Sequence, residues 1–201
     1  MTMKKKLRLF FPVAALAGSV FLFQACNSNT GEANSNPKDS AEEHNEAKFD
    51  KLGEKDAQAL VDAYSAGLME VNMADTAKVY AKTTEAKTLA GKIAEGHTAL
   101  NTQIRNLAEK KQVTLPPDIS ANDKEKISKM ADHDKKNLSF DKDYAEDMVS
   151  KHKDAISLYE KCANECTDQD IRNWFASAVP ELRKHLDLAM NSEEKLKAIK
   201  K

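Results

Sequence analysis

Glycine and proline are scarce in this chain, with only six and five copies among 201 residues. Both disfavour helix interiors, so their scarcity, together with abundant alanine, lysine, glutamate and leucine, favours helices. The chain also lacks a glycine-rich phosphate motif and an evident nucleophile–base pair, which leaves nucleotide and hydrolase chemistry without support. A Cys-x-x-Cys-His sequence is absent too, which argues against haem attachment.

Acidic residues are missing from the start of the chain, where the first one is Glu32. Residues 4–8 carry four basic side chains, and residues 9–23 form an uncharged, almost wholly apolar run. That run of 15 residues is shorter than the roughly 20 that a membrane-spanning helix needs. A basic head, a short apolar run and a small residue before the cleavage point are typical of an export signal. We therefore predict a signal peptide at residues 1–25.

Cys26 is the predicted point of lipid attachment. The stretch Leu22-Phe23-Gln24-Ala25-Cys26 resembles a lipobox, although leucine is usual where Phe23 stands and Gln24 is bulkier than usual. Simple cleavage, with Cys26 free or disulfide-bonded, is the alternative. A multi-acyl anchor gains about 0.8 kcal/mol per buried methylene, so it would hold the protein firmly on a membrane. Asn27 follows Cys26, and the lack of an aspartate there favours the outer membrane of the cell envelope.

The mature chain has no large excess of either charge. It has 27 basic and 32 acidic residues once residues 1–25 are removed. Phosphate binding needs a concentrated basic face, so nucleic acid is not expected as a partner. The membrane, reached through the lipid anchor, is the predicted partner. Protein partners are not indicated.

Residues 26–54 are polar and turn-prone and show no apolar stripe. Such a segment buries too little surface to offset its ordering entropy. We therefore expect a flexible linker there, followed by one domain at residues 55–194, which is long enough for a real core.

Apolar residues recur at helical spacing over four long stretches of this domain. They predict helices at about 56–80 and 85–111, a third from Ser139 and a fourth from Thr167, with a weaker helix near 122–133. Pro180 should kink or split the last helix. Two short turns and one long connection predict an all-α, ferritin-like four-helix bundle, whose crossover connection contains a short helix. A plain up-down bundle is the alternative.

Three of the five histidines fall inside these apolar stripes, namely His97, His152 and His185. Residues three and four apart share a helix face, so the three imidazoles should point inward. Distances from the turns place Glu70 and Glu181 at the same level. We therefore expect these five side chains to converge on one layer of the bundle.

Imidazole and carboxylate groups together are transition-metal ligands. The long stretches contain no Glu-x-x-His pair, which argues against a di-iron site of the known bundle type. One bound metal, such as zinc or copper, remains a candidate cofactor. The other interpretation is a hydrogen-bonded polar cluster without a ligand. The sequence favours this second interpretation, a non-enzymatic envelope lipoprotein with a binding or structural role, over a metal-binding or redox protein.

The other two cysteines, Cys162 and Cys166, lie one helical turn apart. The oxidising envelope favours a local disulfide between them, although this spacing is near the limit of disulfide geometry. Two free thiols or a soft-metal pair are the alternatives.

A family resemblance is carried by several short stretches taken in order. They are Gly67-Leu68-Met69-Glu70-Val71, Ala94-Glu95-Gly96-His97, Leu115-Pro116-Pro117, Phe140-Asp141-Lys142-Asp143-Tyr144, His152 and Val179-Pro180-Glu181-Leu182-Arg183-Lys184-His185-Leu186. Together they resemble an uncharacterised bacterial ferritin-like family, a domain of unknown function common among predicted envelope proteins, over about 120 of the 201 residues. The resemblance implies the crossover bundle and an envelope location, and no activity. One departure is Gly96, which stands where that family usually has an acidic residue.

Overall fold

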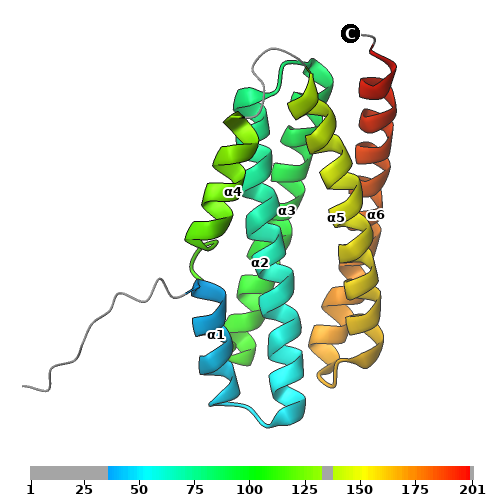
Figure 1. Cartoon of the computed structure of the whole chain (residues 1–201). Coiled ribbons are helices and arrows are strands. Elements are labelled where there is room, and N and C mark those ends of the chain that lie inside the picture. The colour runs from blue at the N-terminus through cyan, green and yellow to red at the C-terminus, as the bar shows by residue number, and fades with distance from the viewer. Residues whose placement is uncertain (1–35, 133–137, 200–201) are drawn as a thin grey trace, which may run out of the picture. The chain divides into compact units, whose positions relative to one another are not determined.

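A computed structural model describes residues 36–132 and 138–199, and these residues form helices and no strand (Figure 1). The helices are α1 (Pro37–Glu46), α2 (Lys51–Tyr80), α3 (Thr84–Lys111), α4 (Ala121–Asp132), α5 (Ser139–Glu165) and α6 (Gln169–Ala198). The predicted all-α fold class is therefore confirmed for the described part. Within these same residues, no helix is both long and apolar enough to cross a membrane. The predicted signal peptide and Cys26 lie outside the described residues.

Side-chain caps define where three of the long helices begin. Asp50 accepts a hydrogen bond from the Gly53 N–H at the start of α2, and Thr83 accepts one from the Ala86 N–H at the start of α3. Asp168 caps α6 by accepting from two backbone N–H groups. Each such cap stabilises its helix by about 1 kcal/mol, so short polar residues fix the ends that apolar periodicity leaves undefined.

The segment predicted as a flexible linker is partly helical. Residues 37–46 form α1, and α2 begins four residues before the predicted domain boundary, at Lys51. Asn45 ties α1 to the chain beyond α3, because its side chain donates to the Thr114 carbonyl at 2.9 Å and accepts from the Thr114 N–H at 2.8 Å. These residues are therefore helical where the sequence predicts a flexible linker, and contacts with α2 and with Thr114 hold α1 although it has no apolar stripe.

Pro180 does not split the last helix. It lies inside α6, which runs through it from Gln169 to Ala198. A proline costs one backbone hydrogen bond and crowds the preceding turn, and the packing of a helix this long outweighs that local cost.

The long helices of the described part pack as two hairpins, α2 with α3 and α5 with α6, and the hairpins meet through α3–α6, α2–α5 and α3–α5 contacts (Figure 1). Asp141, at the start of α5, accepts from the N–H and hydroxyl of Thr83, just before α3. Asp56, near the start of α2, accepts from Thr167 and Asp168, just before α6. Helices α3 and α5 therefore start at the same end, as do α2 and α6. The connection through α4, which packs on α2, returns the chain between the two ends.

Candidate functional site

A polar layer interrupts the apolar core, and each of the four long helices described above contributes one residue to it. These residues are Glu70 of α2, His97 of α3, His152 of α5 and His185 of α6. In every case, one apolar cluster lies before the polar residue along the helix and a second lies after it. The four residues are 3 % exposed or less. The layer therefore lies between two apolar halves of the core.

The polar atoms of the layer face one another at short range. The Nε2 atom of His97 lies 2.8 Å from Glu70 Oε2 and 3.2 Å from His152 Nε2. The same carboxylate oxygen lies 3.5 Å from His152 Nε2. One ring nitrogen from each of the three histidines lies within 4.8 Å of the other two. Donor atoms about 2.0 Å from a tetrahedral metal are about 3.3 Å apart, so the separations of 2.8–3.5 Å among Glu70, His97 and His152 suit a common ion, with His185 close by.

The orientation of His152 is fixed by the backbone. Its Nδ1 lies 2.8 Å from the carbonyl oxygen of Met148. Because a carbonyl only accepts, Nδ1 carries the proton, and in the neutral ring Nε2 presents a lone pair to Glu70 and His97. Metal-binding histidines are typically held in this way, with the non-ligating nitrogen donating to a carbonyl or carboxylate.

The pKa values of the cluster residues are shifted so that several of their atoms carry free lone pairs at neutral pH. Burial lowers the pKa of His152, and burial together with the neighbouring histidines lowers the pKa of His185 to about 4. Burial alone would raise the pKa of Glu70, but the adjacent His97 and His152 outweigh it and hold that pKa below its usual range. Glu70 is thus ionised while His152 and His185 are neutral.

The cluster has fewer protons than acceptors. Glu70 Oε2 and His152 Nε2 can both only accept, and the single N–H on His97 Nε2 cannot be directed at both, so Glu70 Oε2 is left without a hydrogen-bond partner. In addition, Nδ1 of His185 is buried without a hydrogen-bond partner. An unsatisfied buried polar atom costs about 1–3 kcal/mol. A cation placed among these lone pairs would satisfy them together.

Glu181, the fifth residue expected in the layer, lies at its margin. Its side chain is 42 % exposed and pairs with Lys184 at 2.9 Å, while its Oε1 is 3.6 Å from His185 Nε2. The structure therefore brings four of the five predicted residues together and leaves Glu181 on the solvent side of His185.

Gly96 is a residue whose importance the sequence did not reveal. A Cβ atom at this position would lie 2.2 Å from both Cε1 and Nε2 of His185. The missing side chain is therefore what allows the His185 ring to reach α3. The only signal in the sequence was that glycine stands here in place of an acid.

Cys162 and Cys166 are both buried, and the structure records them as free thiols. The α5 helix continues to Glu165 and holds the two cysteines near helical spacing, at the limit of disulfide geometry. A hydrogen bond between the thiols lowers the pKa of Cys162 and raises that of Cys166.

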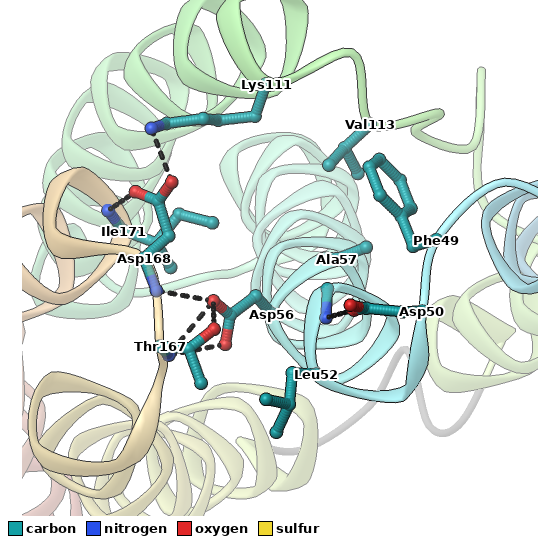
Figure 2. A pocket seen from close by; sticks show the side chains of 11 residues that line it. Phe49, Asp50, Leu52, Asp56, Ala57, Lys111, Val113, Thr167, Asp168 and Ile171 are labelled. Atoms are coloured by element: carbon teal, nitrogen blue, oxygen red, sulfur yellow. Dashed lines mark hydrogen bonds and ion pairs between the residues drawn. The ribbon is translucent and has the colours of Figure 1, made fainter.

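A separate pocket of about 420 Å³ lies where the starts of α2 and α6 meet the end of α3 (Figure 2). Its charged groups are already paired. Lys111 contacts Asp168 at 2.5 Å, and Asp56 accepts from the backbone N–H groups of Thr167 and Asp168 (Figure 2). These groups hold the end of the molecule together, and none of them is free to bind a ligand.

The fold and the polar layer define an all-helical protein with a buried histidine–carboxylate cluster in its core. The model of a domain of unknown function, DUF4142, matches residues 40–191, and the chain belongs to this family. The resemblance to a family of unknown function is thereby confirmed. No curated protein and no solved structure matches the chain. A function must therefore be inferred from the polar layer itself.

Proposed function

We propose that this protein binds a single transition-metal ion through His97, His152, His185 and Glu70. The observation that carries the proposal is the convergence of three imidazole nitrogens and one carboxylate oxygen, all buried, with too few protons to pair them. Imidazole ligands suit zinc, copper, iron and nickel. A metal-binding role thus takes precedence over the ligand-free interpretation that the sequence alone favoured.

One ion fits this layer better than two. Di-iron carboxylate sites in helical bundles draw a glutamate from each of two helices and a Glu-x-x-His pair from each of the other two. The buried layer described here has one carboxylate, Glu70. With His97, His152 and His185 neutral, that carboxylate would leave a divalent ion with one net positive charge.

Metal binding would need a free lone pair on each ligating nitrogen, so protons compete with the ion for these atoms. In the protein alone, the proton on His97 Nε2 serves the acceptors beside it. When that nitrogen becomes a ligand, the proton must leave or move to the other ring nitrogen, because only a lone pair coordinates. Binding therefore weakens in acid.

A structural role is the second candidate. The contacts of His97 with Glu70 and with His152 link α2, α3 and α5 without any ion. A buried polar layer can fix the register of packed helices. On this alternative, the variants below would lose stability and no metal would be found.

The setting of the site is also part of the proposal. We propose that the four long helices form a ferritin-like bundle, which is supported by the shared start of α3 and α5 and by the return of the chain through α4. We further propose an export signal at residues 1–25 and a lipid on Cys26 that holds the domain in the cell envelope, at the outer membrane. The basic head, the short apolar run and the lipobox-like stretch support this.

The test is metal analysis of the full-length protein, purified without a tag. We expect about one equivalent of bound metal by mass spectrometry. We expect His97→Ala and His152→Ala each to weaken zinc or copper binding at least tenfold. His44→Ala is the matched control, because His44 is exposed on α1, outside the layer.

Circular dichroism distinguishes a lost ligand from a lost fold. If His97→Ala keeps its helices but loses the metal, the site is a metal centre. If the wild-type protein holds no metal and takes up neither ion on titration, the proposal is wrong and the structural role stands.

A further inference from the structure

A cleft of about 390 Å³ between α2 and α5 leads from solvent to the polar layer. Of the four layer residues, Glu70 and His97 line it, and His152 and His185 do not. The cleft therefore reaches the carboxylate side of the cluster, while the other two rings lie away from it. The α2 side of the cleft consists largely of small residues: Ala63, Ala66 and Gly67.

The charges along the cleft favour an anion once a metal is present. Lys151 of α5 lines the cleft and acts electrostatically on the Glu70 carboxylate. Asp154 lines it one turn further along α5 and is exposed to solvent. A bound divalent ion is the largest local charge in such a site. The ion and Lys151 together exceed the charge of Glu70 at the inner end of the cleft.

Access of this kind separates two classes of metal site. Structural zinc sites are closed by their four protein ligands, whereas catalytic sites also bind an external ligand and can expand to five-coordinate geometry. Because the polar layer supplies four protein ligands, an external ligand here would be the fifth. A site sealed on all sides would not need a solvent cleft that ends on two of its ligands.

We propose that the metal keeps a coordination position on the cleft side, and that a small anion enters through the cleft and binds the metal there, beside Lys151. This inference rests on the proposed metal site and adds an external ligand to it. In this arrangement α2 forms one wall of the entry route, and Lys151 of α5 is the cation that attracts the anion.

The experiment uses the full-length protein loaded with Co²⁺, whose visible absorption reports coordination, and azide as the anion. We expect a saturable change in the cobalt spectrum on azide titration. Ala66→Phe should weaken azide binding about tenfold or more, because Ala66 is exposed and its new ring would fill the cleft. Ala176→Phe is the matched control, an exposed alanine on α6 outside the cleft, and should bind azide as the wild type does.

Lys151→Gln tests the charge. It should leave cobalt binding intact and weaken azide several-fold, since it removes a cation beside the entry route. If cobalt binds but azide never changes its spectrum, the inference is overturned while the metal site stands. If Ala66→Phe binds azide as tightly as the control, the anion does not use this cleft. If cobalt does not bind at all, the metal site and this inference both fail.

Discussion

Gly96 on α3 packs directly against the ring of His185, and it offers the sharpest single-residue test of the polar layer. Alanine normally stabilises a helix interior by about 1 kcal/mol relative to glycine. At this position the new methyl carbon would lie 2.2 Å from two ring atoms of His185. Gly96→Ala should therefore displace the ring, destabilise the protein by about 1–3 kcal/mol and weaken metal binding at least tenfold, as measured by urea unfolding and metal titration.

Gly91 provides the matched control for this change. It lies in the same helix, and a Cβ atom there would meet nothing within 4 Å. Gly91→Ala should leave metal binding unchanged and stabilise the protein by up to about 1 kcal/mol. Equal behaviour of the two variants would show that His185 does not need the space at Gly96.

The lowered pKa of His185 predicts how the metal-free protein responds to acid. Its pKa is about 4 in the folded protein, against an ordinary value of 6.5. Between these values the unfolded chain binds a proton that the folded protein does not. The free energy of unfolding should therefore fall as the pH is lowered from about 6.5 to about 4, by up to about 3 kcal/mol.

Urea unfolding of the metal-free protein at a series of pH values measures this slope. His152, whose pKa burial also lowers, adds to the loss in the same direction. His185→Gln should make the slope shallower, and His44→Gln, which changes an exposed histidine, should not. A stability that is constant or that rises on acidification through this range would contradict the prediction.

Asp141 and Asp56 show how one buried side chain can join two helical elements. Asp141 is fully buried and accepts from the Thr83 N–H at 2.7 Å and the Thr83 hydroxyl at 2.6 Å, across the top of the α2–α3 turn. Hydrogen bonds to a charged group contribute about 1.5–3 kcal/mol each, and orphaned donors add a further cost. Asp141→Ala should therefore destabilise the protein by about 2–4 kcal/mol in urea unfolding.

Two further variants define what Asp141 contributes. Asp141→Asn keeps one accepting oxygen and should cost less than Asp141→Ala. Asp143→Asn, on the exposed face of the same helix, should change stability by no more than about 0.5 kcal/mol. A loss for Asp143→Asn as large as that for Asp141→Ala would mean that general charge, not the bridge to Thr83, is what matters.

Apolar periodicity predicted the helices that bury a stripe, and it missed the element that does not. The five predicted helices correspond to α2 through α6, with ends shifted by a few residues. The α1 helix buries only Ala41 and Asn45, it packs on α2, and Asn45 bonds to Thr114, 69 positions away in sequence. Bonds of this kind, like those of Asp56 and Asp141, join residues that are distant in sequence. A pattern read along one segment cannot reveal them.

Two properties of each residue decided whether its place in the site could be predicted. They are its height along the bundle and the side of its helix on which it lies. His97 and His152 lie equally far from the first residues of α3 and α5, and these helices start at the same end, so the two rings meet. Glu181 is the residue of α6 that counting placed at the right level, yet its position on the helix turns it toward solvent. His185, one turn later, faces inward and reaches the layer because Gly96 leaves room. Counting residues from the helix ends predicts the height of a residue along the bundle. Only the packing of the helices decides which side chain enters the layer at that height.

At the scale of the whole molecule, the proposal joins a metal-binding domain to a membrane through Cys26. One acyl chain holds a protein only marginally on a bilayer, whereas several chains hold it stably, at about 0.8 kcal/mol per buried methylene. We therefore expect the full-length protein to incorporate labelled palmitate and to sediment with membranes when expressed in a bacterium. Cys26→Ser should abolish the label and move the protein to the soluble fraction, with its metal content unchanged.

Cys162→Ser is the control for a general effect of losing a thiol. Cys162 is buried in the helical domain, away from the predicted lipobox, so this variant should stay on the membrane with its label. Density-gradient separation should place the wild-type protein with the outer membrane. Label that persists in Cys26→Ser, or a Cys26→Ser protein that still sediments with membranes, would refute lipid anchoring at this cysteine. The metal site would be unaffected by that result, because the residues that form it all lie between Glu70 and His185.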